Sequence, residues 1–288
     1  MKMRSLITFV LLASLFSTAV AAGRLPDTAS VVYTKTDSLL AEQLISRFSK
    51  NPGKDGGALV AQIGREFLNT PYVAQTLENG VQERLIINLR ELDCTTFAEN
   101  CLALALAARS EKPGFEQFIN ELEKIRYRRG KRNGYLSRLH YFSDWISDNA
   151  EKGLISEPAS GFGSPFNVHV GFMSAHPDSY PVLKDHPDLV PLMARQEKLI
   201  SEREQFFLKK EDVRSNEDKL REGDIVGLTT TVAGLDVTHV GILVKKNGRI
   251  HLLHASSSLE KVVISDEPLS EMLAIKKSYT GIVIARPK

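Results

Sequence analysis

Cys94 has the sequence context of a reactive thiol. It follows Leu-Arg-Glu-Leu-Asp93 and precedes Thr95-Thr96-Phe97, where an Ala- and Leu-rich helix is expected to begin. A thiol at a helix N-terminus meets the positive end of the macrodipole, which lowers its pKa. The backbone N–H groups there can also bind a developing oxyanion. This position indicates a nucleophile, although a Cys that only fills a helix cap fits the position equally well.

Two expected strands, residues 236–244 and 249–255, are joined by Asn247-Gly248. This dipeptide favours a two-residue type I′ hairpin turn. Counting outward from such a turn pairs Gly241 with His254, so the turn fixes the register of both strands.

His239 lies two residues before Gly241 and therefore points to the same face as His254. The two histidines are then diagonal cross-strand neighbours within reach of one another, and Gly241 leaves room beside them. His251 lies three residues from His254 and points to the opposite face. The register thus selects His239 and His254 as a pair.

A thiol and two imidazoles fit the logic of nucleophile, base and orienting residue. Cys94 attacks, His239 transfers the proton, and His254 orients the imidazole of His239. A zinc site made from the same three residues is the competing chemistry. It lacks a closely spaced ligand pair such as His-x-x-x-His or Cys-x-x-Cys, so we expect no metal and no other cofactor.

The elements that must position these residues are helices first and strands afterwards, which predicts an α+β fold with an antiparallel sheet. A helix capped by Thr36-Asp37 is expected to run to about residue 50. Residues 22–57 are expected to form a linker and this N-terminal helix. Residues 58–288 are expected to form a single catalytic domain, with a mostly helical and loop insertion at about 111–220 between its two halves. Further helices are expected at 58–68, 94–109, 115–126, 139–149 and 192–210, and strands from 221 onward.

The N-terminus has the order of a secretory signal peptide. Lys2 and Arg4 precede an apolar run from Leu6 to Phe16, and Ala19-Val20-Ala21 offers a cleavage site. Residues 1–21 are therefore expected to be removed, leaving a periplasmic protein with no membrane span in its mature form. The net charge of +2 gives no support for a nucleic-acid partner. We expect the protein to be a monomer.

The second cysteine, Cys101, lies seven residues after Cys94. On one helix this separates the two residues by roughly 10 Å along the axis, which is too far for a disulfide. Cys101 is flanked by Leu and Ala and is expected to be a small buried hydrophobic residue.

At these residues the sequence resembles the NlpC/P60 cysteine peptidases. The resemblance rests on Thr70-Pro71-Tyr72, Asp93-Cys94, Thr238-His239-Val240-Gly241 and His254-Ala255-Ser256. More narrowly, the chain resembles the DUF1460 branch of N-acetylmuramoyl-L-alanine amidase-like enzymes. That match adds Asn69 to Val73 with Thr76-Leu77-Glu78, Asn88 to Phe97, and Arg138-Leu139-His140-Tyr141-Phe142.

The resemblance implies a papain-like core and peptidoglycan or muropeptide fragments as substrate. For the DUF1460 branch it implies cleavage between N-acetylmuramic acid and L-alanine, whereas most of the superfamily cuts the γ-D-glutamyl bond to a diamino acid. It assigns Tyr72 and Asp93 to the surroundings of the nucleophile, with Tyr72 helping to bind the oxyanion. It assigns Arg138, Tyr141 and Ser164 to the substrate cleft, although a core role suits the aromatic residues equally well.

Two other classes of function remain open on the sequence alone. A catalytically silent peptidoglycan-binding module would keep the cleft, although nucleophile, base and orienting residue are all present. A transglutaminase- or acyltransferase-like enzyme on a related fold would use the same thiol with an amine acceptor.

Overall fold

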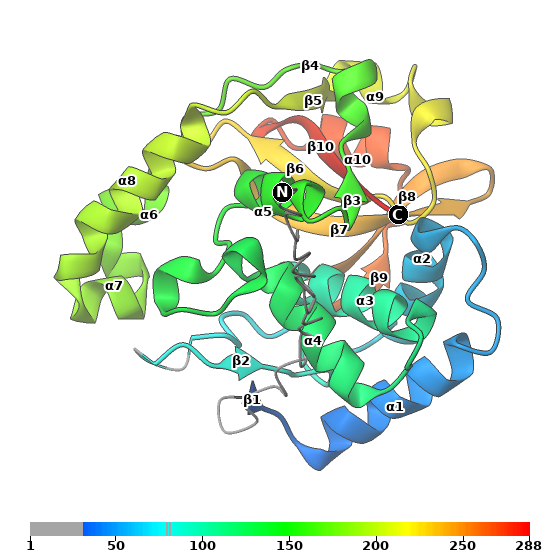
Figure 1. Cartoon of the computed structure of the whole chain (residues 1–288). Coiled ribbons are helices and arrows are strands. Elements are labelled where there is room, and N and C mark those ends of the chain that lie inside the picture. Colours follow the sequence, from blue (N-terminus) through cyan, green and yellow to red (C-terminus); the bar gives the residue numbers. More distant parts are fainter. Residues whose placement is uncertain (1–30, 79, 81) are drawn as a thin grey trace, which may run out of the picture.

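The computed structural model describes residues 31–78, 80 and 82–288. The expected signal peptide, residues 1–21, lies outside the described residues. The fold mixes helices with an antiparallel sheet, as predicted (Figure 1). The helices are α1 (Lys35–Phe48), α2 (Gly56–Glu66), α3 (Cys94–Arg109), α4 (Phe115–Arg126), α5 (Phe142–Glu151), α6 (Phe172–Ala175), α7 (Pro181–Asp185), α8 (Val190–Ser201), α9 (Lys210–Val213) and α10 (Leu269–Ile275).

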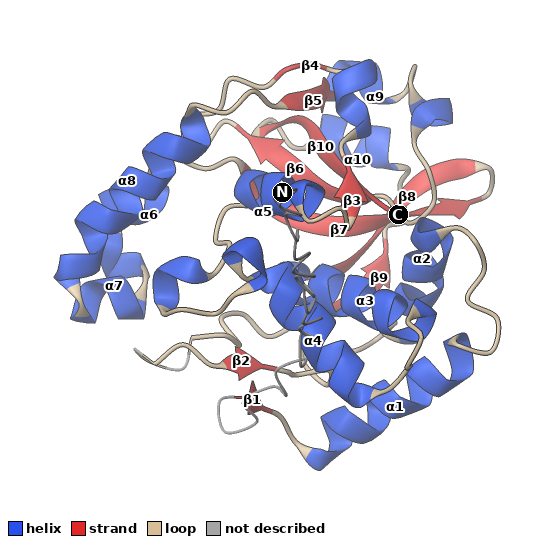
Figure 2. Cartoon of the chain, viewed as in Figure 1, coloured by secondary structure: helices blue, strands red, loops and turns tan. Residues whose placement is uncertain are grey.

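The main sheet has eight strands, and all of its pairings are antiparallel (Figure 2). Its order is β4-β5-β10-β6-β7-β8-β9, with β3 paired to β10. A separate two-stranded parallel sheet joins β1 to β2. The strands are β1 (Val31–Val32), β2 (Leu85–Ile86), β3 (Ile155–Ser156), β4 (Ser164–Pro165), β5 (Phe206–Lys209), β6 (Ile225–Thr230), β7 (Val237–Lys246), β8 (Arg249–Ser256), β9 (Lys261–Ile264) and β10 (Tyr279–Pro287).

The hairpin of β7 and β8 has the predicted register. Lys246 pairs with Arg249 and Ile242 with Leu253. Asn247 and Gly248 both have positive φ, 52° and 76°, as a type I′ turn requires. The turn chemistry therefore sets the register of the strands that carry the two histidines.

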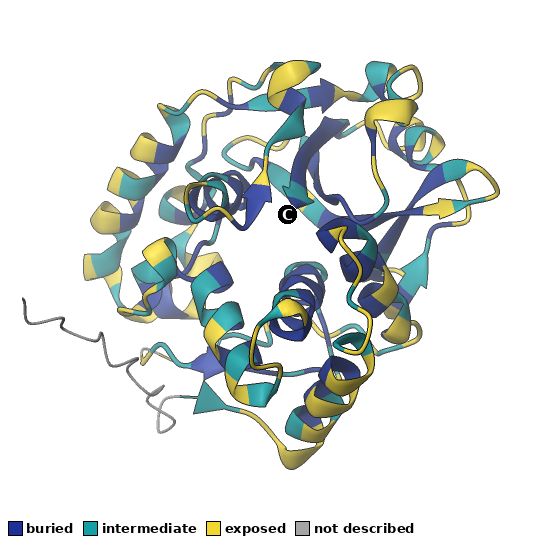
Figure 3. Cartoon of the chain, turned by 45° about the vertical axis from the view of Figure 1, so that its right-hand side comes forward, coloured by how far each residue is buried: buried dark blue, intermediate teal, exposed yellow. Residues whose placement is uncertain are grey.

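Apolar side chains cover both faces of the main sheet. On one face, α2 and α3 pack against β7 in the largest hydrophobic cluster, which includes Phe97, Val240 and Leu253. On the other face, α9 and α10 cover a second cluster around Leu252 and Ile284. Figure 3 shows the central strands buried, whereas the peripheral helices turn exposed residues outward.

Several helix boundaries differ from the expected ones. Helix α1 is capped by Thr34 rather than by Thr36-Asp37, and Asp37 is the third residue of the capping box. The helix expected at 192–210 ends at Ser201, because residues 206–209 instead form β5 and pair with β10. The small parallel sheet of β1 and β2 was not predicted.

Residues 111–220 contribute to more than one part of the molecule. Helix α4 packs on α3, and β5 belongs to the main sheet. Helices α6 to α8 instead surround a third hydrophobic cluster that includes Tyr141, Met173 and Met193. The boundaries of an insertion at about 111–220 remain a prediction.

Candidate active site

Cys94 is the first residue of α3, and a capping box sets its position. The Asp93 carboxylate accepts a hydrogen bond from the Thr96 N–H at 2.7 Å, and Thr96 Oγ1 accepts one from the Asp93 N–H at 3.0 Å. Reciprocal bonds of this kind satisfy N–H groups that the helix leaves unpaired. Cys94 is partly exposed and its thiol is free. Cys101 is also free and fully buried, as predicted.

A cavity of about 190 Å³ brings Cys94 together with His239. One wall comes from the start of β7, including Asp236, His239 and Val240, and another from Phe142 and Trp145 of α5. The two aromatic rings of α5 stack at 5.2 Å with an interplanar angle of 11°. The cavity thus combines a thiol and an imidazole with an apolar wall.

The two predicted histidines contact one another. His239 Nε2 lies 2.7 Å from His254 Nδ1, and the rings are nearly perpendicular. Nε2 of His239 is engaged by this contact, so a proton taken up by the ring would go to Nδ1. The space beside Gly241 is filled by Leu252, since a Cβ at Gly241 would lie 2.7 Å from Leu252 Cδ1. His251 lies buried with its Nδ1 2.9 Å from the Ser265 carbonyl oxygen, outside this pair.

The structure contradicts the expected low pKa of Cys94. Burial, followed by the negative charge of Asp93, raises the pKa of the Cys94 thiol to about 11, and the Val240 N–H opposes this only in part. Burial, the charge of His254 and the charge of Lys276 lower the pKa of His239 to about 3. Burial lowers the pKa of His254 to about 4. Thiol and imidazoles are therefore all neutral near pH 7.

Of the other predicted site residues, some lie near Cys94 and others stabilise the surrounding structure. Burial raises the pKa of the Tyr72 phenol, and the negative charges that Cys94 and Asp93 carry when ionised raise it further, so Tyr72 lies near both residues. The Asp93 carboxylate is used in the helix cap. Arg138 is buried and bonded to Glu78 at 2.6 Å, on the wall of an adjoining cavity that shares Thr95 and His140 with the first.

Of two expected cleft residues, Tyr141 borders the cavity and Ser164 does not. Tyr141 borders the cavity, but its hydroxyl donates to the Glu197 carboxylate at 2.6 Å and accepts from the Met173 N–H at 3.0 Å. It thereby fastens α8 to the domain. Ser164 lies on β4, pairs with Phe207 and is not among the residues lining either cavity.

Sequence reasoning missed Tyr180 and Asp236. Tyr180 borders both cavities and comes from the segment before α7, whose composition carried no recognisable signal. Asp236 is buried, and its oxygens accept hydrogen bonds from the N–H groups of Ser143 and Val237, both at 2.7 Å. An Asp directly before a strand that carries a histidine was the one available hint.

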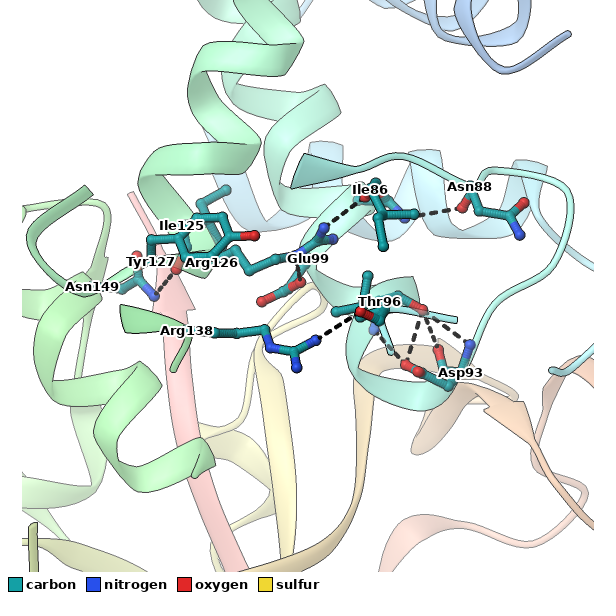
Figure 4. A network of polar contacts seen from close by, with 12 residues as sticks. Ile86, Asn88, Asp93, Thr96, Glu99, Ile125, Arg126, Tyr127, Arg138 and Asn149 are labelled. Carbon is teal, nitrogen blue, oxygen red and sulfur yellow. Dashed lines mark hydrogen bonds and ion pairs between the residues drawn. The ribbon is translucent and has the colours of Figure 1, made fainter. Parts of the chain in front are cut away.

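A buried ion pair supports α3 one turn beyond Cys94. Glu99 accepts a hydrogen bond from Arg126 Nε of α4 at 2.7 Å, and Arg126 Nη1 donates to the Ile86 carbonyl oxygen at 2.7 Å (Figure 4). Both side chains are nearly inaccessible to solvent. The pair therefore connects α3, α4 and the segment that leads toward Cys94.

Within residues 31–78, 80 and 82–288, no group of three or more His, Cys, Asp or Glu side chains is arranged to hold a metal ion. In the part of the chain that the structure describes, no helix combines the length and apolar character needed to cross a membrane.

Comparison with solved structures supports both the fold and the family. An N-acetylmuramoyl-L-alanine amidase from Bacteroides uniformis is 39% identical, with a TM-score of 0.76 over 81% of this chain and 99% of that chain. A putative xylanase from Bacteroides fragilis is 43% identical, with a TM-score of 0.74 over 78% of this chain and 99% of that chain. A DUF1460 protein from Legionella pneumophila shares the fold at 19% identity, with a TM-score of 0.65 over 88% of this chain and 94% of that chain.

No curated protein matches the sequence significantly. Residues 62–282 match the AmiA-like family model, described as N-acetylmuramoyl-L-alanine amidase-like. This match covers most of the chain and includes Cys94, His239 and His254. The chain therefore belongs to the AmiA-like family of N-acetylmuramoyl-L-alanine amidase-like proteins.

Proposed function

We propose that the protein is an exported cysteine amidase with a papain-like NlpC/P60 core, acting in the periplasm. Its substrate is peptidoglycan or a muropeptide, and the bond cut joins N-acetylmuramic acid to L-alanine. The observation that carries this proposal is the 2.7 Å contact between His239 and His254 beside the cavity that Cys94 and His239 share. Family membership supports the substrate class.

In the proposed mechanism the Cys94 proton moves to His239 Nδ1 while Sγ attacks the lactyl carbonyl carbon. A neutral His239 can accept this proton at Nδ1 only if its Nε2 carries a hydrogen, so Nε2–H donates to His254 Nδ1. His254 thereby fixes the tautomer and the ring orientation of the base. The oxyanion is stabilised by N–H groups at the start of α3 and by the Tyr72 hydroxyl.

Collapse of the tetrahedral intermediate breaks the C–N bond. His239 returns its proton to the departing L-alanine nitrogen, and the lactyl carbonyl remains on Cys94 as a thioester. Water then gives a proton to His239, attacks the thioester and releases the muramic acid carboxylate. His239 then returns this proton to the Cys94 sulfur, which restores the thiol.

The name of one structural relative, a putative xylanase, suggests glycoside hydrolysis. That reaction generally requires two carboxyl groups flanking the bond. Among the described residues that line the cavity around Cys94, only Asp236 has a carboxyl group, and backbone N–H groups occupy both its oxygens. The chemistry of the cavity favours amide hydrolysis.

The test is mass spectrometry of a muramyl tetrapeptide incubated with the mature protein or with Cys94→Ala. We expect an intact tetrapeptide with a free N-terminal L-alanine from the unmodified protein alone. A sugar fragment that retains L-alanyl-glutamate would move the cut to the γ-D-glutamyl bond. Equal release by Cys94→Ala would overturn the cysteine mechanism, and cleavage by neither protein would overturn this substrate.

A further inference from the structure

The segment that leads into Cys94, residues 85–93, is tied to the N-terminal helix α1 by a buried carboxylate. We propose that Asp37 of α1 is a positioning residue for Cys94, acting through the backbone of this segment. The proposal rests on the proposed function in taking Cys94 as the nucleophile. It assigns a catalytic contribution to a helix that precedes the residues matched by the family model, 62–282.

Asp37 is fully buried and both of its carboxylate oxygens are engaged. Oδ1 accepts hydrogen bonds from the Leu89 N–H at 2.9 Å and from Arg90 Nε at 3.1 Å. Oδ2 accepts bonds from the N–H and the hydroxyl of Thr34 at 2.9 and 2.5 Å. Burial opposes ionisation, but these hydrogen bonds keep the pKa of Asp37 below its ordinary value. The anchor is therefore charged at neutral pH and held in one orientation.

The segment between this anchor and Cys94 is short, and it is braced both internally and against residues 71–73. Asn88 Oδ1 accepts bonds from the N–H groups of Arg90 and Glu91, both at 3.1 Å. The Leu92 N–H then donates to the Pro71 carbonyl oxygen at 3.0 Å. A braced turn transmits a displacement instead of absorbing it. A shift at Leu89 would therefore move the start of α3 and with it Sγ of Cys94.

The segment also has anchors farther from Cys94. The Ile87 N–H donates to the Val32 carbonyl oxygen at 2.9 Å, and Arg126 holds the Ile86 carbonyl oxygen. These contacts hold residues 86 and 87 without Asp37, so loss of Asp37 should shift the part of the segment from Leu89 onward without unfolding the protein. The expected signature is slower chemistry with nearly unchanged substrate binding.

Helix α1 supplies its own matched control. Glu42 Oε1 accepts a hydrogen bond from the Phe115 N–H at 2.9 Å and docks α1 onto the start of α4. Like Asp37, it joins a carboxylate of α1 to a backbone N–H, but this N–H belongs to α4 and not to residues 85–93. Glu42→Gln therefore perturbs the docking of α1 without perturbing the path to Cys94.

The experiment compares the full mature chain with Asp37→Asn, Glu42→Gln and Thr34→Val, which removes the hydroxyl donor to Asp37 and with it the side-chain cap of α1. Each protein is assayed for kcat and KM on the muramyl tetrapeptide and for its melting temperature. The rate of Cys94 alkylation by iodoacetamide is measured as well, and buried Cys101 serves as the unreactive reference. Alkylation needs no substrate, so it tests the positioning of Cys94 even if the proposed substrate is wrong.

For Asp37→Asn we expect kcat to fall roughly 10- to 100-fold, because misplacement of a reacting group by about 1 Å has an effect of that size. KM should change less than about threefold, and the alkylation rate should differ from that of the unmodified protein. Thr34→Val should show the same pattern more weakly, and it carries the test if Asp37→Asn does not fold. The proposal is overturned if Asp37→Asn or Thr34→Val matches Glu42→Gln in kcat and alkylation rate at comparable melting temperatures.

Discussion

Cys94 and His239 are both held neutral, which separates this site from one that stores a thiolate–imidazolium pair. The positive end of α3 and the Val240 N–H favour the thiolate, but burial and the Asp93 carboxylate outweigh them. Burial and His254 likewise oppose a charged His239. In the proposed mechanism the proton must then leave the thiol during attack, which makes the distance between Sγ and the base decisive.

The raised pKa of the Cys94 thiol predicts how its alkylation rate depends on pH. Because the thiol pKa is about 11, the rate of reaction with iodoacetamide should keep rising with pH and level off only near that value. Mass spectrometry of the Cys94 adduct between pH 6 and 11 measures it. A plateau already reached below pH 7 would show that a thiolate is stored and that the helix N-terminus outweighs burial.

At the scale of single elements, α3 is fixed both at its start and in its interior. The capping box of Asp93 and Thr96 sets the first turn. The Glu99–Arg126 pair then joins α3 to α4 in a region that excludes solvent. Removing one partner of a buried ion pair leaves an uncompensated charge, which costs much more than loss of an exposed pair.

We therefore predict that Glu99→Gln lowers the free energy of unfolding by about 3–5 kcal/mol. The matched control is Glu66→Gln. It breaks a pair of similar length, 2.7 Å to Arg47, whose side chains are 31% and 60% exposed. That change should cost no more than about 1 kcal/mol. Urea unfolding measures both variants. Equal losses of unfolding free energy would mean that the bond from Arg126 to the Ile86 carbonyl oxygen is enough to stabilise buried Arg126.

At the scale of the whole molecule, buried neutral histidines couple folding to pH. The pKa values of His239 and His254 are lowered to about 3 and 4 in the folded protein, whereas an unfolded histidine titrates near 6.5. Below pH 6.5 the unfolded chain binds protons that the folded chain rejects. These residues therefore destabilise the fold as pH falls from about 6.5 toward 4.

Replacing His239 by Asn should remove one of the sites that bind a proton in the unfolded chain but not in the folded chain. Between pH 6 and 5 the unfolding free energy of the unmodified protein should fall faster than that of His239→Asn, by about 1 kcal/mol per pH unit. Taking the difference cancels the contributions of carboxyl groups common to both proteins. Urea titrations at the two pH values provide the measurement, and parallel slopes would show that His239 is already charged in the folded state.

Sequence patterns predicted the structure correctly where residues close together in the chain determine it. The Asn247-Gly248 turn and strand alternation predicted the contact between His239 and His254. The Ala- and Leu-rich run from Cys94 to Arg109 predicted α3 with its observed bounds. Both predictions depend on short-range geometry that a single sequence contains.

Properties set by residues distant in the chain were not predictable. The sign of the Cys94 pKa shift depends on how deeply the fold buries the thiol. The pairing of β1 with β2 and the bond from the Leu89 N–H to Asp37 join residues about 50 positions apart. The buried bond between Arg138 and Glu78 likewise joins residues 60 positions apart. No local pattern specifies such contacts.

The neutral state of Cys94 also has a consequence for the chemical durability of the protein. Disulfide exchange and peroxide oxidation both proceed through the thiolate. A thiol that ionises only near pH 11 exposes almost none of that form at neutral pH. In the periplasmic setting proposed above, this low thiolate content protects a free cysteine that has no resolving partner.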